Sequence, residues 1–193
     1  MDSFGIIKRD TVPKPAFTVE EMESILASAD NIRDRTLLYF LQATGLRVGE
    51  ASKINLSDID WINRTVTVRL GKGGYSSRVV PLNDRIVYML KQYMVWRGDN
   101  NVTCDVLFVG KKGNNKPISN ACIEQMVRET GKRANVLNAH PHRYRTTFIT
   151  NLLARGMKLE EVQILAGHKD IQTTVSYNRC NLTDIKNKFI RVA

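Results

Sequence analysis

The apolar residues of this 193-residue chain mostly recur at the spacing of three and four positions that is typical of α-helices. The first helix is predicted to begin after Thr18, because Thr18 and Glu21 have the spacing of a capping box. A dense apolar block over residues 37–41 predicts a second, buried helix that ends near Gly45. The first quarter of the chain is therefore expected to be helical.

Further helices are indicated where a polar capping residue precedes apolar positions at helical spacing. Asn83 and Ser119 are two such residues, and each is expected to begin a helix. Three more helices are predicted towards the C-terminus, over residues 143–154, over residues 160–166 and after Asp170. Most of the chain is thus expected to be helical.

A small part of the chain has the pattern of β-strands. Residues 65–68 alternate between polar and apolar side chains, and residues 78–80, which precede a proline, are their expected partner. The glycine-rich residues 71–74 between them predict a hairpin tip, and residues 105–109 form a short apolar run, strand or extended. The predicted fold is mainly α with a small antiparallel β-sheet, in the α+β class.

The charge of the chain points to a polyanionic partner. Lysine and arginine number 29 and aspartate and glutamate 19, which gives a net charge of +10. The charges are interspersed, so a disordered basic tail is not expected. A merely basic soluble protein would have the same composition, and the charge alone does not decide between the two.

Several classes of protein are not expected from this composition. The three cysteines form no C-x-x-C pair, which argues against a disulfide framework or a zinc site and suggests a reduced, cytosolic setting. No segment has the ~18 consecutive apolar residues of a membrane span. The N-terminus also lacks the apolar core of a signal peptide.

The last third of the chain carries the residues that are most informative about chemistry. His142, Arg145, His168 and Tyr177 follow one another there, and Arg47 lies far upstream. Arginines present a planar fork to phosphate oxygens, and histidines move protons near neutral pH. A tyrosine can act as a covalent nucleophile. This set of side chains suits chemistry on a phosphodiester.

This ordered set resembles the tyrosine recombinase, or phage integrase, family. That family carries an arginine in a G-x-R-x-x-E context, a lysine on a β-hairpin, an H-x-x-R motif, a Gly-His pair and then a nucleophilic tyrosine. Each has a match here, in the same order, from about Phe17 to Tyr177. Each motif alone is short, but the ordered set with fitting gaps is specific.

The resemblance implies a covalent mechanism on double-stranded DNA. Tyr177 would attack a phosphodiester and form a 3′-phosphotyrosyl link, which conserves the bond energy so that no ATP is needed. Arg47 and Arg145 would neutralise the charge of the transition state. Because paired arginines can replace a divalent cation in this role, neither a metal nor another cofactor is expected.

The resemblance also assigns the remaining site residues. His142 would accept the proton of the tyrosine, and Lys72, on the hairpin tip, would protonate the leaving 5′ oxygen. His168 would complete the contacts to the scissile phosphate. Glu50, three residues after Arg47, is expected to orient an arginine or to brace the fold.

Each of these residues also has a simpler interpretation. His140 competes with His142, and only the match to P-H-x-x-R distinguishes them. Lys72 could be an exposed turn lysine, and His168 could cap the end of a helix. Glu50 could form a simple ion pair with a neighbouring arginine.

Tyr177 is one of six tyrosines. Three of the others are predicted to be core or boundary residues of helices, one lies on the hairpin loop and one stands beside the H-x-x-R motif: Tyr39, Tyr88, Tyr93, Tyr75 and Tyr144. Only Tyr177 follows a Thr-Thr pair after the Gly-His pair, which is the family's arrangement.

The chain is expected to form one catalytic domain with two short flanking segments. Residues 1–16 are predicted to be a linker or arm, residues 17–181 the catalytic domain, and residues 182–193 a tail that docks on a neighbouring protomer. The resemblance implies a monomer in free solution and a synaptic tetramer on DNA, in the cytoplasm and associated with the nucleoid. Since the family usually adds an N-terminal DNA-clamping domain, the chain is either a fragment or a short form.

Two alternatives to a site-specific recombinase or integrase remain open at this point. A type IB topoisomerase or a telomere resolvase would form the same phosphotyrosyl link without exchanging strands between two site-bearing duplexes. A catalytically idle DNA-binding module of the same fold would need basic charge, but it would not need the tyrosine.

Overall fold

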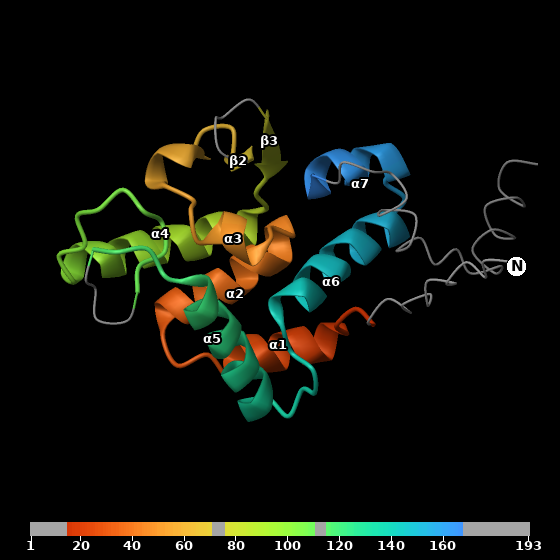
Figure 1. Cartoon of the computed structure of the whole chain (residues 1–193), viewed down its shortest axis with the longest axis horizontal. Helices are drawn as coiled ribbons and strands as arrows, with labels where there is room; N and C mark the ends of the chain where they lie inside the picture. The colour runs from red at the N-terminus through yellow and green to blue at the C-terminus, as the bar shows by residue number, and fades with distance from the viewer. Residues whose placement is uncertain (1–14, 71–75, 111–114, 168–193) are drawn as a thin grey trace, which may run out of the picture.

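The computed structural model describes residues 15–70, 76–110 and 115–167, and these ranges are mainly helical (Figure 1). The helices are α1 (Val19–Ala27), α2 (Ile32–Thr44), α3 (Val48–Ala51), the 3-10 helix η1 (Leu56–Asp58), α4 (Asp84–Asp99), α5 (Asn120–Arg133), α6 (Pro141–Ala154) and α7 (Leu159–Ala166). Together with one small antiparallel sheet, they confirm the predicted α+β class.

The helix starts follow the capping residues that the sequence indicates. Thr18 and Glu21 form the predicted capping box at the start of α1. The side chains of Asn83 and Ser119 accept backbone hydrogen bonds at the starts of α4 and α5. At the end of α2, Gly45 adopts the left-handed conformation with a φ of 61°, which a glycine tolerates without steric cost.

The sheet has the order β1-β2-β3, with β1 (Ile59–Asp60), β2 (Thr65–Leu70) and β3 (Ser76–Pro81). Val66 pairs with Val80, and Val68 pairs with Arg78, so these four residues share one face. The three valines are buried in the core, and so is Arg78. The two longer strands were predicted, whereas the two-residue β1 was not.

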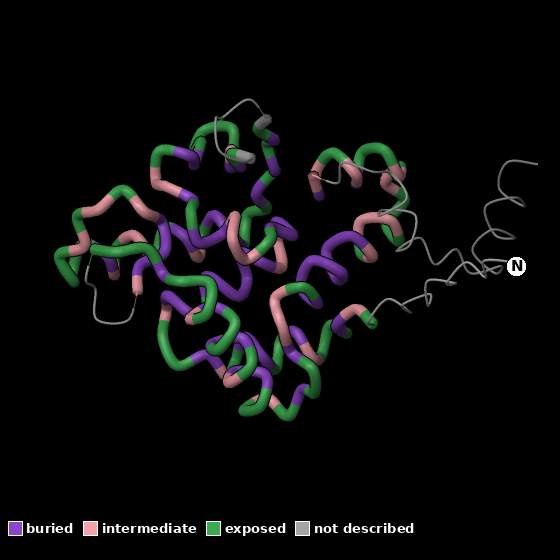
Figure 2. The backbone as a smooth tube through the Cα atoms, viewed as in Figure 1, coloured by how far each residue is buried: buried purple, intermediate pink, exposed green. Residues whose placement is uncertain are grey.

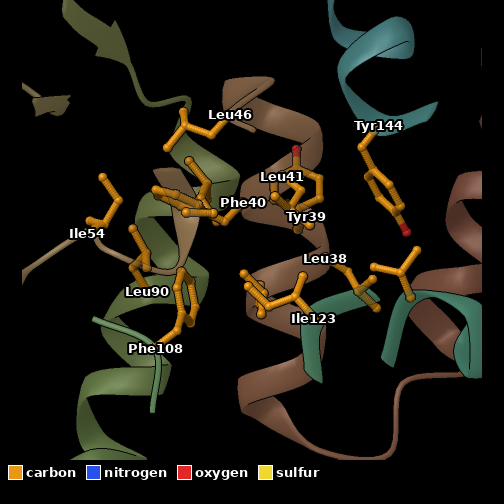
Figure 3. Packing of buried hydrophobic residues seen from close by; sticks show 14 of the residues in the cluster. Leu38, Tyr39, Phe40, Leu41, Leu46, Ile54, Leu90, Phe108, Ile123 and Tyr144 are labelled. Atoms are coloured by element: carbon orange, nitrogen blue, oxygen red, sulfur yellow. The ribbon is translucent and has the colours of Figure 1, made fainter. Parts of the chain in front are cut away.

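The main core lies around α2, which packs against α4 on one side and α6 on the other (Figure 1). Figure 3 shows Phe40 of α2 beside Leu90 of α4 and Phe108 of the segment that follows α4. A second, smaller core joins α6 to α7 and consists of Phe148, Ile149, Val162 and Ala166. Figure 2 shows that the middle of α6, over residues 143–149, is buried. This helix contributes to both cores.

Two details differ from the simplest expectation. Residues 105–109, which were predicted as strand or extended, form no regular strand but two isolated bridges, Asn55 with Val106 and Val109 with Pro117. Leu107, Phe108 and Val109 are buried. Tyr88 was expected at the core or its boundary, yet its exposed fraction on α4 is 64%.

Among the described helices, none is long and apolar enough to span a bilayer.

Candidate functional site

The start of α6 places two of the predicted site residues on one face of a helix. His140 is the N-cap, because its Nδ1 accepts a hydrogen bond of 3.3 Å from the backbone N–H of Arg143. Pro141 occupies the first turn, where its missing N–H costs nothing. His142 and Arg145 then face the same cleft. The capping role of His140 favours His142 as the histidine that serves the site.

Arg145 is seated between the ends of two other helices. One terminal nitrogen donates to the carbonyl oxygen of Gly45 at 2.8 Å, and the other donates to the carbonyl oxygen of Ala166. Only 2% of the residue is exposed, although it lines the cleft. Its guanidinium is therefore held in place before any ligand arrives, which reduces the entropic cost of binding an anion.

Arg47 is the N-cap residue of α3, and it is the more accessible of the two predicted arginines. Its backbone N–H donates to Oε2 of Glu50 at 2.8 Å. One terminal nitrogen lies 3.3 Å from Oε1 of Glu50 and 3.4 Å from the carbonyl oxygen of Gly167. Because 47% of the side chain is exposed, much of its guanidinium faces solvent at the cleft.

Glu50 binds a second arginine that the sequence did not single out. Both terminal nitrogens of Arg78 donate to the Glu50 carboxylate, at 3.0 and 2.8 Å. Burial raises the pKa of the Glu50 carboxyl, but the hydrogen bonds from Arg78 and from the backbone of Arg47 outweigh this effect and leave the pKa below its usual value. Glu50 is therefore a carboxylate at neutral pH, and it accepts hydrogen bonds from both Arg47 and Arg78.

The last turn of α7 receives one hydrogen bond from each of three arginines. Arg78 donates to the carbonyl oxygen of Leu165 at 2.8 Å, while Arg145 and Arg47 donate to the next two carbonyl oxygens along the chain. The last carbonyls of a helix lack partners within the helix, and cations at this end oppose its dipole favourably. The last turn of α7 is thus held by three arginines, of which Arg47 and Arg145 also line the cleft.

The cleft has a volume of about 870 Å³ and is lined mainly by basic and polar side chains. From α5 it gains Glu124, Arg128 and Lys132, which follow one another at the four-residue spacing of one helix face. Arg47, His142 and Arg145 also line the cleft. A positively charged cleft next to a helix N-terminus is suited to binding phosphate groups.

The structure brings together four of the seven predicted site residues: Arg47, Glu50, His142 and Arg145. The other three, Lys72, His168 and Tyr177, lie outside the described residues, as do the helix expected after Asp170 and the tail over residues 182–193. Sequence reasoning missed three basic residues of the site, Arg78, Arg128 and Lys132. The spacing along α5 could have revealed two of them.

The described tyrosines offer no competing nucleophile in the cleft. Tyr39, Tyr93 and Tyr144 are buried, and burial raises the pKa of both Tyr93 and Tyr144, so that ionisation is unfavourable. Tyr88 is exposed, but it does not line the cleft. Within residues 15–70, 76–110 and 115–167, no group of three histidine, cysteine or acidic residues is arranged to hold a metal ion.

The chain is similar in sequence and in fold to known recombinases. The sequence model of the phage integrase family matches residues 15–183. Tyrosine recombinase XerA of Pyrococcus horikoshii is 33% identical over 191 residues, a match that covers 97% of this chain and 64% of that protein. The crystal structure of XerA recombinase matches with a TM-score of 0.80 at 28% identity and covers 92% of this chain and 64% of that one.

A third match is a pre-cleavage complex of XerH site-specific recombinase bound to difH substrate. Its TM-score is 0.72 at 26% identity, and the match covers 89% of this chain and 52% of that one. The chain thus spans less than two thirds of the length of these relatives. The family match includes every residue of the cleft, together with Lys72, His168 and Tyr177. The chain therefore belongs to the phage integrase family.

Proposed function

We propose that this chain is the catalytic domain of a site-specific recombinase that cleaves and rejoins double-stranded DNA through a 3′-phosphotyrosyl intermediate. The observation that carries the proposal is the convergence of Arg47, His142 and Arg145, from two separate parts of the chain, on one basic cleft. A protein that only bound DNA would need the positive charge, but it would not need two preorganised arginines beside a proton acceptor.

In the proposed reaction, the hydroxyl oxygen of Tyr177 attacks the scissile phosphorus while the bond to the 5′ oxygen breaks. His142 accepts the tyrosine proton, because an unperturbed tyrosine titrates near ~10 and requires a base at neutral pH. Lys72 donates a proton to the departing 5′ oxygen, and His168 hydrogen-bonds to the phosphate. Reversal by the same or another 5′ hydroxyl restores the phosphodiester.

The arginines supply the charge that this transition state requires. Arg145 is held by two carbonyl oxygens and Arg47 by Glu50, so their guanidinium groups need little reorganisation when negative charge develops on the phosphate. The first turn of α6 adds the positive end of a helix dipole to the same cleft. We propose that this arrangement works without a metal ion and without ATP.

The proposed partner is double-stranded DNA. The chain has a net charge of +10, and Arg128 and Lys132 extend the positive charge of the cleft along α5. The structurally similar XerH recombinase is bound to its difH substrate in the pre-cleavage complex, which supports a DNA partner for this chain. The names of the relatives favour strand exchange over the relaxation or end-sealing of a topoisomerase or a telomere resolvase.

We further propose the division into residues 1–16 as arm, 17–181 as catalytic domain and 182–193 as a tail that docks on a neighbouring protomer. The assembly would be monomeric in free solution and tetrameric on two DNA sites, associated with the nucleoid. Sedimentation of the free chain and of its complex with duplex DNA would check this, and a stable tetramer without DNA would contradict it.

Covalent trapping on plasmid DNA tests the proposed activity. The 193-residue chain and its Tyr177→Phe variant would be incubated with supercoiled plasmid in EDTA without ATP and then denatured with detergent. We expect protein-linked nicks and relaxed circles from the unmodified chain alone. Adducts from both proteins would assign the nucleophile to another residue, and adducts from neither would contradict activity of this chain.

A further inference from the structure

Arg78 occupies a position in β3 where the pattern of the sheet calls for an apolar side chain. It stands opposite Val68 and shares the inner face with Val66 and Val80, all of which are buried. Only 6% of Arg78 is exposed. Burying a guanidinium is unfavourable unless the group is paired and hydrogen-bonded, so its contacts indicate why it is there.

The contacts of Arg78 are with residues that adjoin the cleft. Two of the nitrogens of Arg78 hold the Glu50 carboxylate, and its Nε holds the carbonyl oxygen of Leu165. The guanidinium also lies directly on Gly167, where an added Cβ atom would come within 2.6 Å of a terminal nitrogen. Gly167 immediately precedes His168 in the sequence. Arg78 thus contacts two structures that border the proposed reaction centre without lining the cleft itself.

The Glu50 carboxylate connects Arg78 to Arg47, because both arginines donate hydrogen bonds to it. Its two oxygens accept four hydrogen bonds, two from Arg78 and two from Arg47. A carboxylate has about four lone-pair positions, so all of them are occupied. Removing the Arg78 fork would free the carboxylate to turn, and Arg47 would lose the anchor that fixes its backbone and its guanidinium.

We propose that Arg78 is a positioning residue for strand cleavage. It orients Arg47 through Glu50, and it fixes the end of α7 from which the segment with His168 continues. This inference rests on the proposed function, and it goes beyond that function because Arg78 is not one of the residues that the family resemblance assigns.

A lysine cannot reproduce this geometry. An ammonium group carries the same charge, but it lacks the planar fork that reaches both carboxylate oxygens and a carbonyl at fixed angles. The Arg78→Lys variant therefore keeps the charge of the site and loses its geometry. A displacement of about 1 Å in a site of this kind can lower a rate by about 100-fold.

Arg97 provides a matched control for the loss of a buried arginine. It is 3% exposed and donates to the carbonyl oxygens of Cys104, Val106 and Leu107, away from the cleft. The Arg97→Lys variant should therefore lose a comparable amount of stability without disturbing Arg47 or α7. Urea unfolding of both variants would establish that they are folded and comparably destabilised.

The test compares the full chain with both variants in two measurements. With nicked duplex DNA at saturating protein, we expect Arg78→Lys to slow covalent adduct formation by about 10- to 100-fold, while the affinity for DNA changes by less than about threefold. Arg97→Lys should cleave within about twofold of the unmodified chain. Hydrogen exchange in α7, over residues 159–167, should accelerate in Arg78→Lys only.

The outcomes separate this inference from the proposed function. Absence of adducts from the unmodified chain would contradict the proposed function. The rate of hydrogen exchange in α7 would still decide whether Arg78 positions this helix. Three results would each overturn the positioning role. The first is an unchanged rate of hydrogen exchange in α7 of Arg78→Lys, and the second is an equal acceleration in Arg97→Lys. The third is a cleavage rate in Arg78→Lys equal to that of the unmodified chain.

Discussion

Arg145 donates a hydrogen bond to the carbonyl oxygen of Ala166, which ties a residue of the cleft to the last turn of α7. Its second terminal nitrogen holds the carbonyl oxygen of Gly45, so one guanidinium joins the ends of two helices that are far apart in sequence. His168 follows Ala166 by two positions in the sequence. Arg145 therefore both lines the cleft and holds the last turn of α7 in place.

Gly45 sets the approach of α2 to α6, and we expect Gly45→Ala to be strongly destabilising. Its φ is 61°, and an added Cβ atom would lie 2.3 Å from Cδ1 of Phe148. We expect a loss of about 2–4 kcal/mol in the free energy of unfolding, measured with urea. Gly98→Ala is the control, because its Cβ atom would meet nothing within 4 Å, and it should stabilise by about 0.5 kcal/mol. Similar effects of the two substitutions would be inconsistent with the close packing at Gly45.

The ion pair between Glu50 and Arg78 should be strongly coupled. Their side chains are 11% and 5% exposed, so either single substitution, Glu50→Gln or Arg78→Gln, leaves a charge without its main partner. We expect each to cost about 3 kcal/mol of unfolding free energy, whereas the double variant should cost clearly less than the sum. A double-mutant cycle measures this coupling, and additive losses would argue against it.

The same pair should make part of the stability dependent on pH. Hydrogen bonds from Arg78 and the Arg47 backbone hold the pKa of Glu50 below its usual value of 4.5, despite the opposing effect of burial. Its stabilising contribution is therefore present above about pH 4.5 and is lost as the pH falls through the lowered pKa. We expect the stability difference between the unmodified chain and Glu50→Gln to shrink as the pH falls below the usual pKa of 4.5.

An exposed ion pair is the control for this pH dependence. Glu23 pairs with Arg85 at the surface, where 52% and 51% of the side chains are exposed, so Glu23→Gln should change stability by no more than about 0.5 kcal/mol. Unfolding free energies measured in urea at each pH would provide the comparison. A difference for Glu50→Gln that stayed constant down to the lowest pH would argue against a lowered pKa.

Neighbouring basic residues on α5 should differ in their effect on DNA binding. Lys132 lines the cleft, whereas Arg133 pairs with Asp30 at 3.0 Å and lines a different hollow. Lys132→Ala should weaken binding to duplex DNA. It should also reduce the slope of the logarithm of the DNA-binding constant against the logarithm of the salt concentration by about 1. Arg133→Ala removes the same charge and should leave that slope nearly unchanged. Equal reductions would mean that only net charge matters.

The sequence predicts the helices of this chain well because their boundaries are coded locally. Thr18 with Glu21, Asn83 and Ser119 each cap the helix that the pattern assigns to them. The same holds for His142 and Arg145, whose spacing places them on one face of α6. The short strand β1 carries no comparable signal, since two residues are too few for a period to emerge.

Arg78 could not be predicted in the same way. Its partners lie 28 and 87 positions away, at Glu50 and Leu165, so no local pattern reveals why a charge stands in a buried strand. The convergence of three arginines on the end of α7 is likewise a property of tertiary packing. Such contacts depend on how α3, α6 and β3 meet, and only the fold shows this.

Mapping the linkage between protein and DNA is the measurement that bears most directly on the proposed chemistry. The adduct would be digested with nuclease and trypsin, and the modified peptide sequenced by mass spectrometry. We expect the nucleotide, joined through its 3′ phosphate, on the peptide of residues 170–179, whose one tyrosine is Tyr177. A nucleotide on any other peptide, or one joined through a 5′ phosphate, would contradict cleavage by Tyr177 at this cleft.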